Sequence, residues 1–236
     1  MIDKNKIKAI AFDFGGTLDS PFLHWMDIYI HLYTTRLNLP LTKENFRDSY
    51  VYAEQMMERL QLVKSHHSLL ETQTFKTNLQ FRSLIERGIL SDTPVNREEL
   101  PLQAAQLVTD YSSEYVIASR PVLARLHDSY TLLLVSNYYG NLKNIVTDLG
   151  IISYFHSITD STLEGIRKPD SALWKVAIER AGFSCEEVLV VGDSMKNDIL
   201  PGLSLGCQVI QGCPEKKEET EITTITHLDE LERILL

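Results

Sequence analysis

Three continuous runs of apolar residues, rich in β-branched side chains, punctuate the chain. They are Ile7–Phe14, Thr131–Val135 and Val188–Val191, and each stops abruptly at polar or glycine residues. An apolar run bounded by turn residues is typical of a strand buried on both faces, which is the usual environment in a parallel sheet. The pattern therefore predicts at least three buried parallel strands.

Helical patterns occupy stretches between and after these runs. They are Asn141–Leu149, Ser171–Ala181 and His227–Leu236, and glycine follows each of the first two. Glycine just past the last helical residue is the usual left-handed stop. Strands alternating with helices predict an α/β fold with a doubly wound, Rossmann-like parallel sheet. Its ligand site is expected beyond the carboxyl ends of the strands.

The segment after the first strand breaks this alternation. From about Phe22 to Ile117 the apolar periodicity is helical, which predicts about four or five inserted helices, with N-caps at Thr42 and Asp92. Its apolar stripes are expected to form its own core; they are Trp25, Ile28, Tyr29, Leu32 and Tyr33, then Val51, Met56, Leu60 and Val63. We therefore divide the chain into a core of residues 1–20 and 119–236 and a helical domain of residues 21–118. The charged run 215–219 is expected to be a solvated loop.

Composition narrows the class of protein. The 236 residues are 44% hydrophobic, enough for a substantial core, and the net charge is −9. No block of Lys and Arg suggests nucleic-acid binding, and the short apolar run at the N-terminus suits neither a signal peptide nor a membrane span. The three cysteines have no zinc-ligand spacing. We expect a cytoplasmic protein whose partners are small molecules.

Polar residues stand where the predicted strands end. Asp13 closes the first run, Ser136 and Asn137 follow the second, and Asp193 follows the third with Asp198 five residues later. If these strands are neighbours, three carboxylates converge in one pocket and repel one another unless they share a cation. Mg²⁺ prefers oxygen ligands and is the natural occupant.

A lysine and a hydroxyl complete the candidate chemistry. Lys168 lies just ahead of a predicted helix, where it can neutralise an anionic nucleophile and a bound phosphate together. Ser136 offers a hydroxyl group. The turn Tyr138–Gly140 leads into a helix whose free amides suit phosphate oxygens.

In this order, the motifs resemble those of the haloacid dehalogenase (HAD) superfamily, which consists mostly of phosphatases that pass through an aspartyl phosphate. The motifs are Asp13–Leu18, Ser136, Lys168–Asp170, and Gly192–Asp193 with Asp198. The similarity covers residues 1 to about 20 and 119–236. An insertion after the first strand is where this family places its C1 cap, so the resemblance implies that residues 21–118 cover the substrate.

The resemblance also implies a role for each motif residue. Asp13 would be the nucleophile, and Ser136 and Lys168 would hold the phosphoryl group. The metal site would comprise Asp13, the Gly15 main-chain carbonyl, Asp193 and Asp198, with Asp198 orienting a metal-bound water. The substrate-binding residues would be Gly16, Thr17 and Asn137, with Thr17 fixing the glycine turn.

Gly15 departs from the pattern of the family's phosphatases. They carry a second aspartate there, which protonates the leaving alcohol and then activates water. Losing a positioned acid/base costs about 100-fold to 10,000-fold in rate, or roughly 3 to 5.5 kcal/mol.

Three explanations of Gly15 stay open. In the first, the protein is a phosphatase whose leaving group needs little protonation, or whose missing acid/base is replaced by another group. The candidate groups are the substrate itself, Tyr138, Tyr139, His24 and Asp19. Alternatively, the chemistry is that of a dehalogenase or phosphonate hydrolase, although the Asp193 and Asp198 pair speaks against the metal-free dehalogenases. Thirdly, the protein binds a metabolite without turnover.

We rank a Mg²⁺-dependent phosphoryl hydrolase acting on a small phosphorylated metabolite first. Candidate anion contacts from the inserted helices are Arg36, Arg47 and Arg82, although surface salt bridges are the commoner use of an arginine.

Overall fold

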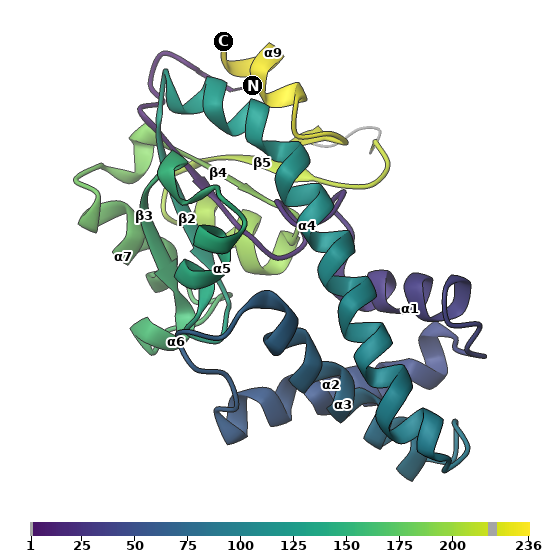
Figure 1. Cartoon of the computed structure of the whole chain (residues 1–236). Helices are drawn as coiled ribbons and strands as arrows, with labels where there is room; N and C mark the ends of the chain where they lie inside the picture. The colour runs from purple at the N-terminus through teal and green to yellow at the C-terminus, as the bar shows by residue number, and fades with distance from the viewer. Residues whose placement is uncertain (1, 217–220) are drawn as a thin grey trace.

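The computed structural model describes residues 2–216 and 221–236, and its centre is a six-stranded, all-parallel sheet in the order β3-β2-β1-β4-β5-β6 (Figure 1). The strands are β1 Ala9–Phe12, β2 Thr131–Ser136, β3 Phe155–Asp160, β4 Val188–Gly192, β5 Gln208–Gly212 and β6 Thr223–Ile225. The predicted doubly wound α/β fold is confirmed. The chain builds β1, β2 and β3 to one side and then returns to place β4 against the other side of β1. This reversal creates a crevice at the carboxyl ends of the central strands, where ligands bind in such sheets.

Helices cover both faces of the sheet because side chains alternate along each strand. Ile10 and Phe12 face a cluster that includes residues of α4 (Leu100–His127), α5 (Leu142–Asp148) and α9 (Glu230–Leu235). Ala9 and Ala11 face the opposite cluster, with α7 (Ala172–Arg180) and Ile199. The remaining helical elements of the core are α6 Ser161–Glu164, α8 Leu200–Ser204, the π-helical turn η4 Met195–Ile199, and the 3₁₀ turns η2 Ile152–Tyr154 and η3 Cys185–Glu187.

The apolar runs predicted the strands buried on both faces but not the outer ones. All residues of β1 and β4 are buried, whereas β3 exposes His156, and β6 has only three residues. A strand at or near the edge of a sheet meets water on some of its positions, so its sequence lacks a continuous apolar run. The predicted C-terminal helix is also shorter than expected, because α9 begins only at Glu230.

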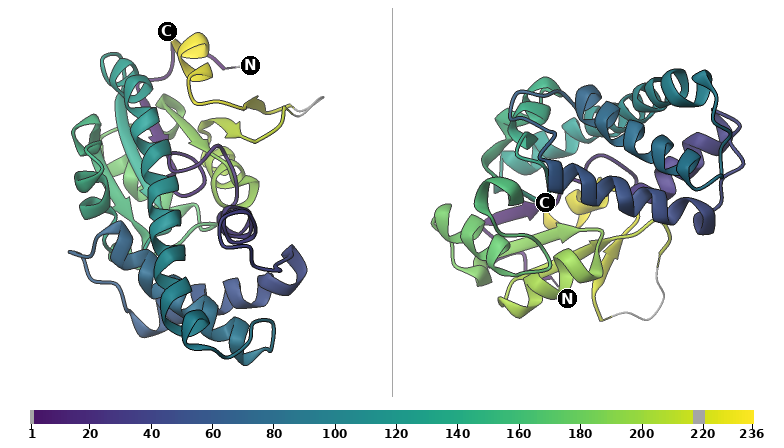
Figure 2. Two further views of the ribbon diagram at one scale, coloured as in Figure 1. Left: turned by 45° about the vertical axis from the view of Figure 1, so that its right-hand side comes forward. Right: turned by 90° about the horizontal axis from the view of Figure 1, so that it is seen from below.

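The inserted segment is helical, as predicted. It consists of α1 Trp25–Thr35, α2 Lys43–Leu60, α3 Leu69–Glu86, the π-helical turn η1 Val95–Glu99 and the long α4. Figure 2 shows α4 running from these helices to the sheet. Its Val108 packs in the core of the inserted helices and its Leu123 in the core beside the sheet. The division between residues 118 and 119 falls inside α4 and stays a prediction.

One of the two predicted helix caps is present. The Thr42 hydroxyl accepts a hydrogen bond from the Asn45 amide at 3.2 Å, and the Asn45 side chain accepts one from the Thr42 amide at 2.8 Å. The prediction of Asp92 as a cap is wrong. Asp92 pairs instead with Arg97, and the Thr93 hydroxyl accepts the hydrogen bond from the amide of Asn96.

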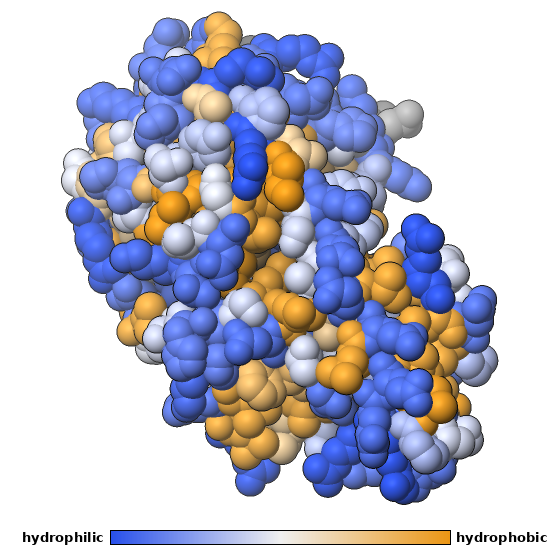
Figure 3. All heavy atoms as spheres, viewed as in Figure 1, coloured by the Kyte–Doolittle hydropathy of each residue, from blue (hydrophilic) through white to orange (hydrophobic). Residues whose placement is uncertain are grey.

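The predicted stripe Val51, Met56, Leu60 and Val63 is wrong within α2, although Val63, just past the helix, is buried. Val51 and Leu60 are 41% and 50% exposed, while Phe46, Ala53 and Met57 are buried. The inner face of the helix is therefore rotated relative to the expectation: Phe46, Ala53 and Met57, at i, i+7 and i+11, form it. On the side of the molecule seen in Figure 3, apolar residues gather over the lower part, where the inserted helices lie, and mostly hydrophilic residues cover the sheet domain.

The stripe on α1 packs as predicted except at its first residue. Ile28, Tyr29, Leu32 and Tyr33 are buried in the core of the inserted helices, but Trp25 is only partly buried. Of the charged run 215–219, Glu215 and Lys216 are exposed and the rest lies outside the described residues. Within the described ranges, no helix has the length and apolar character needed to cross a bilayer.

The cap at Thr42 gives a test of the inserted helices. Thr42→Ala removes the hydroxyl acceptor, and we expect the free energy of unfolding to fall by about 1 kcal/mol. Thr42→Ser retains an acceptor and should preserve most of that stability. Urea unfolding followed by circular dichroism measures both, and equal losses in the two variants would contradict the capping role.

Candidate active site

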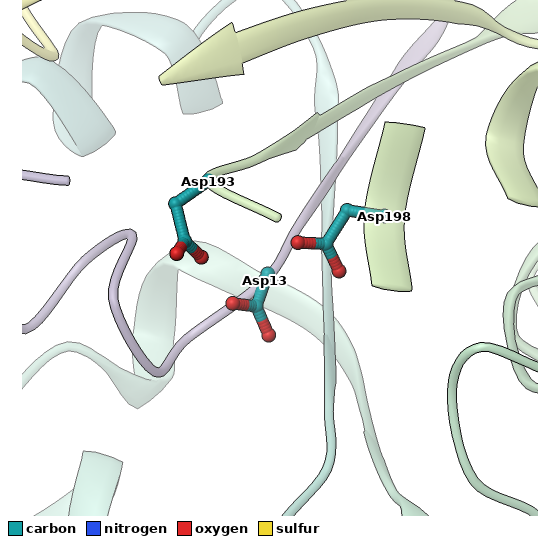
Figure 4. A group of neighbouring side chains, drawn as sticks. All are labelled: Asp13, Asp193 and Asp198. Carbon is teal, nitrogen blue, oxygen red and sulfur yellow. The ribbon is translucent and has the colours of Figure 1, made fainter. Parts of the chain in front are cut away.

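Three carboxylates meet at the crevice where the central strands end (Figure 4). Asp13 follows β1 and Asp193 follows β4, and these two strands pair in register with Phe12 beside Val191. Asp198 comes from the turn η4. One oxygen from each of the three acids lies within 4.8 Å of the others. The sequence-based expectation that these acids converge is therefore met by the geometry.

Lys168 joins two of these acids. Its Nζ lies 2.6 Å from Oδ1 of Asp13 and 2.7 Å from Oδ1 of Asp198, and its side chain is only 3% exposed. Nζ also donates to the Val135 carbonyl at 3.2 Å and lies 4.9 Å from the centre of the Trp174 ring. An ammonium group held this way neutralises part of the negative charge of the crevice.

Asn137 holds the main chain of Lys168 in place. Its side-chain oxygen accepts from the Lys168 amide at 2.9 Å, and its side-chain nitrogen donates to the Lys168 carbonyl at 2.9 Å. The residue after β2 thereby fixes the loop that carries the lysine. Asn137 also lines the cavity above the acids.

Hydroxyl groups contact both Asp13 oxygens. Ser136 donates to Oδ1 of Asp13 at 3.1 Å. The Thr17 hydroxyl lies 3.2 Å from Oδ2 of Asp13 and 3.4 Å from Oδ1 of Asp193, and it accepts from the Asp193 amide at 3.1 Å. Thr17 thus connects the loop after β1 with the loop after β4.

The glycine turn after Asp13 depends on close packing. Gly16 has φ +89°, and a Cβ there would lie 2.9 Å from the Asp193 carboxyl group, so only glycine fits. Its amide donates to Oδ1 of the fully buried Asp19 at 2.6 Å. Gly15 lines the cavity, whereas Gly16 and Thr17, which were expected to bind the substrate, do not. Asp19 closes this turn and does not cap α1, whose N-cap is His24.

Burial dominates the titration of the acids. It raises the pKa of Asp193 to about 8, reinforced by the charges of Asp13 and Asp198. It raises the pKa of Asp198 to about 6, with Lys168 opposing the shift. Burial likewise raises the pKa of Asp19 to about 8. For Lys168, burial acts to lower the pKa, but Asp13 and Asp198 outweigh it and the pKa is raised.

Three converging carboxylates with one lysine fit a hard divalent cation such as Mg²⁺, which takes oxygen ligands.

A cavity of about 520 Å³ opens above the acids. The inserted helices supply one wall, formed by His24, Trp25, Tyr50, Glu54, Gln73 and Lys76, and the core adds Tyr138, Tyr139 and Arg167. None of the three arginines suggested by the sequence, Arg36, Arg47 and Arg82, lies on this wall.

A buried charged cluster occupies the wall opposite the acids. Lys76 Nζ lies 2.7 Å from Oε1 of Glu54, and the Tyr139 hydroxyl donates to Oε2 at 2.5 Å. The rings of Tyr139, Tyr29 and Trp25 surround the ammonium, with centres 5.2, 5.9 and 6.0 Å from Nζ. Sequence reasoning missed Glu54 and Lys76 because charged residues on a helix are usually solvated. A signal for Glu54 is Tyr50, four residues earlier on the same face of α2, whereas the face of Lys76 carries Thr72, Gln73 and Gln80 and gives no such signal.

Three acids and a lysine meet around one point at the carboxyl ends of the parallel strands. This arrangement in an α/β domain is typical of one class of hydrolase. The haloacid dehalogenase-like hydrolase family matches residues 7–206 of this chain. The chain belongs to that family.

Curated relatives match over shorter stretches. They include a haloacid dehalogenase-like hydrolase domain-containing protein 3 of Danio rerio, 36% identical over 31% of this chain and 30% of that protein. A pyrimidine 5′-nucleotidase of Escherichia coli is 29% identical over 43% and 48% of the two chains. A phosphoglycolate phosphatase of Vibrio cholerae is 29% identical over 52% and 60%. The chain thus spans about a third to three fifths of the length of these relatives.

Solved structures share the fold over nearly the whole chain. A dehalogenase with an intermediate complex superposes with a TM-score of 0.63 at 14% identity, covering 100% of this chain and 99% of that one. The YfnB protein of Bacillus subtilis, bound to magnesium, gives a TM-score of 0.58 at 20% identity, with 97% and 98% covered. Identities this low establish the fold alone.

The raised pKa values predict how stability depends on pH. A carboxyl whose pKa is higher in the folded than in the unfolded chain binds more protons when folded, so stability falls as pH rises. For Asp198 and Asp193 the fall runs from their ordinary value near 3.8 to about 6 and about 8. We expect the metal-free protein to lose on the order of a few kcal/mol of unfolding free energy across this window.

Millimolar Mg²⁺ should reduce this loss because the cation compensates the carboxylates in place of protons. Asp19 adds a slope that Mg²⁺ leaves unchanged, so the readout is the difference between urea titrations with and without the metal. Asp193→Asn is the control and should shrink that difference. Identical pH slopes with and without Mg²⁺ would contradict a cation site at these acids.

Proposed function

We propose that the protein is a Mg²⁺-dependent phosphoryl hydrolase that acts on a small phosphorylated metabolite through an aspartyl phosphate on Asp13. One observation carries the proposal. Asp13 lines the cavity, its Oδ1 is held by Lys168 and Ser136, and Asp193 and Asp198 lie beside it. A carboxylate that is oriented and charge-compensated in this way is suited to nucleophilic attack.

The first step transfers the phosphoryl group to Asp13. The bond between phosphorus and the leaving oxygen breaks as one between phosphorus and an Asp13 oxygen forms. A carboxylate and a phosphate dianion repel each other, and the Lys168 ammonium offsets that repulsion at 2.6 Å from Asp13. The hydroxyl of Ser136 and the loop held by Asn137 would orient the phosphoryl oxygens. Water then cleaves the aspartyl phosphate and releases inorganic phosphate.

The oxygens of Asp13 and Asp193, the Gly15 carbonyl and, through water, Asp198 would hold the Mg²⁺ ion. When bound, the ion supplies charge neutralisation for the nucleophile and the phosphoryl oxygens. The role of Asp198 agrees with its contacts, because its Oδ1 pairs with Lys168 and its Oδ2 accepts from the Ser194 amide at 3.0 Å.

The inserted helices would act as a cap over the substrate. They supply one wall of a cavity whose volume, about 520 Å³, suits a small metabolite. The names of curated relatives favour phosphate chemistry, since they include a nucleotidase, a glyceraldehyde 3-phosphate phosphatase and a phosphoglycolate phosphatase.

The test of this proposal measures phosphate release by the purified protein with Mg²⁺ from a panel of phosphate esters and acyl phosphates, and halide release from 2-haloacids. We expect release that EDTA abolishes and Mg²⁺ restores. Asp13→Asn should reduce kcat by on the order of 1,000-fold or more, because it removes the nucleophile and the covalent route. The matched control is Asp148→Asn, the same chemical change at an exposed position.

Other outcomes would point elsewhere. Phosphate release that survives Asp13→Asn would remove the nucleophile assignment. Halide release from a 2-haloacid without Mg²⁺ would identify dehalogenase chemistry. If no compound reacts while Gly15→Asp gains phosphatase activity, the protein is a metabolite-binding relative without turnover.

A further inference from the structure

The space beside Gly15 is filled by an aromatic ring. A Cβ built on Gly15 would lie 3.4 Å from Nε1 and 3.7 Å from Cδ1 of Trp25. An acid at residue 15 would have to share this space with the indole. The indole N–H is a hydrogen-bond donor only and does not ionise in the neutral pH range. Proton transfer to a leaving group must therefore come from another side chain, if it occurs at all.

His24 cannot provide it in this geometry. Its Nδ1 accepts a hydrogen bond from the Met26 amide at 3.2 Å, so the neutral ring carries its proton on Nε2 and has no free lone pair to act as a base. Burial lowers the pKa of His24, so the cationic form that could act as an acid is disfavoured. The side chain can donate a hydrogen bond to a ligand but is unsuited to proton transfer.

Glu54 is also fully engaged. Oε1 pairs with Lys76 and Oε2 accepts from the Tyr139 hydroxyl. Although burial acts to raise its pKa, Lys76 and the hydrogen bonds outweigh burial and the pKa is lowered. Glu54 therefore stays a carboxylate with no proton to give.

The other substitutes suggested by the sequence fail for similar reasons. The Tyr139 hydroxyl already donates to Glu54, and burial raises the pKa values of Tyr138 and Tyr139 far above the neutral range. Asp19 does not line the cavity, and its Oδ1 accepts from the Gly16 amide. Among the described residues, the wall opposite Asp13 thus consists of groups fixed in one protonation state.

We propose that this site takes acyl phosphates, whose leaving group departs as a stable carboxylate without accepting a proton, and that the phosphoryl group then accumulates on Asp13. The proposal rests on the phosphoryl hydrolase function proposed above. Asp13 attacks phosphorus, the bond from phosphorus to the acyl oxygen breaks, and the electron pair leaves with the carboxylate. No proton moves in this step.

The second step, hydrolysis of the aspartyl phosphate, is slow because no positioned base is available to accept the proton of the attacking water. Water attacks the phosphorus, the Asp13 carboxylate leaves, and the proton from water has to pass to a phosphoryl oxygen or to solvent. Without a positioned base this step loses about 100-fold to 10,000-fold in rate. The aspartyl phosphate is therefore the species that builds up during turnover.

A leaving-group series tests the first part. The full chain with Mg²⁺ is mixed with acetyl, p-nitrophenyl, phenyl and ethyl phosphate, and the rate of phosphorylation is followed by quenching and intact mass measurement. We expect the rate to fall by at least about 100-fold from acetyl to ethyl phosphate, the factor that an acid would otherwise supply. We also expect most of the enzyme to carry one phosphoryl group at steady state with acetyl phosphate.

The alternatives are distinguishable. Ethyl and acetyl phosphate reacting at similar rates, or turnover with no phosphoenzyme, would overturn this inference while leaving the hydrolase function intact. If no donor releases phosphate and none phosphorylates Asp13, the proposed function itself is overturned, and the inference with it. Asp13→Asn identifies the site of the added mass.

A pair of variants tests the part played by the indole. Gly15→Asp with Trp25→Ala adds a carboxyl group and the room for it, and Trp25→Ala alone is its matched control. We expect the double variant to shorten the lifetime of the phosphoenzyme by at least about 10-fold relative to the control, a conservative share of what a positioned base contributes. Equal lifetimes in the two variants would contradict the assignment of the slow step to a missing base at this position.

Discussion

The ammonium of Lys168 between Asp13 and Asp198 is the interaction on which the strand-end crevice depends. Three carboxylates enter this space from two loops and a turn, and a buried charge without a partner is strongly destabilising. The lysine lies within 2.7 Å of two of them, and Asn137 fixes its main chain. Because the lysine arrives from a loop far along the chain, the arrangement exists only after the parallel sheet has brought β1, β2 and β4 together.

The inserted helices repeat this solution on the opposite wall. Lys76 is buried among aromatic rings and pairs with the partly exposed Glu54, and Tyr139 of the core donates to Glu54, so the two parts of the molecule share one polar cluster. A ligand between these walls would meet fixed charges and dipoles at low effective dielectric, where electrostatic effects are stronger than in water. Groups that are already oriented need little rearrangement when the charge of a reacting phosphate shifts.

The sequence predicted the centre of the fold better than its periphery, for a physical reason. Central strands are buried on both faces and read as apolar runs, so β1, β2 and β4 and the polar residues at their ends were placed correctly. Strand β3, which exposes His156, and the three-residue β6 leave no such signal. On helices, periodicity separates the inside from the outside, but it does not tell which outer residues face a second domain. Glu54 and Lys76 were missed for that reason, and Trp25 was expected in the core of the inserted helices rather than on the wall of the site.

Gly15 shows where sequence reasoning must stop and packing must decide. A glycine in place of an aspartate could leave a void that water or part of a substrate fills, and either could carry a proton. Trp25 lies against that position instead, held in contact with the ring of Tyr29, whose own hydroxyl pairs with Gln73. A Cβ at residue 15 would meet the indole at ordinary contact distance, so the room left for a carboxyl group depends on where Trp25 lies. The packing of α1 therefore decides, together with residue 15, whether an acid can lie beside Asp13.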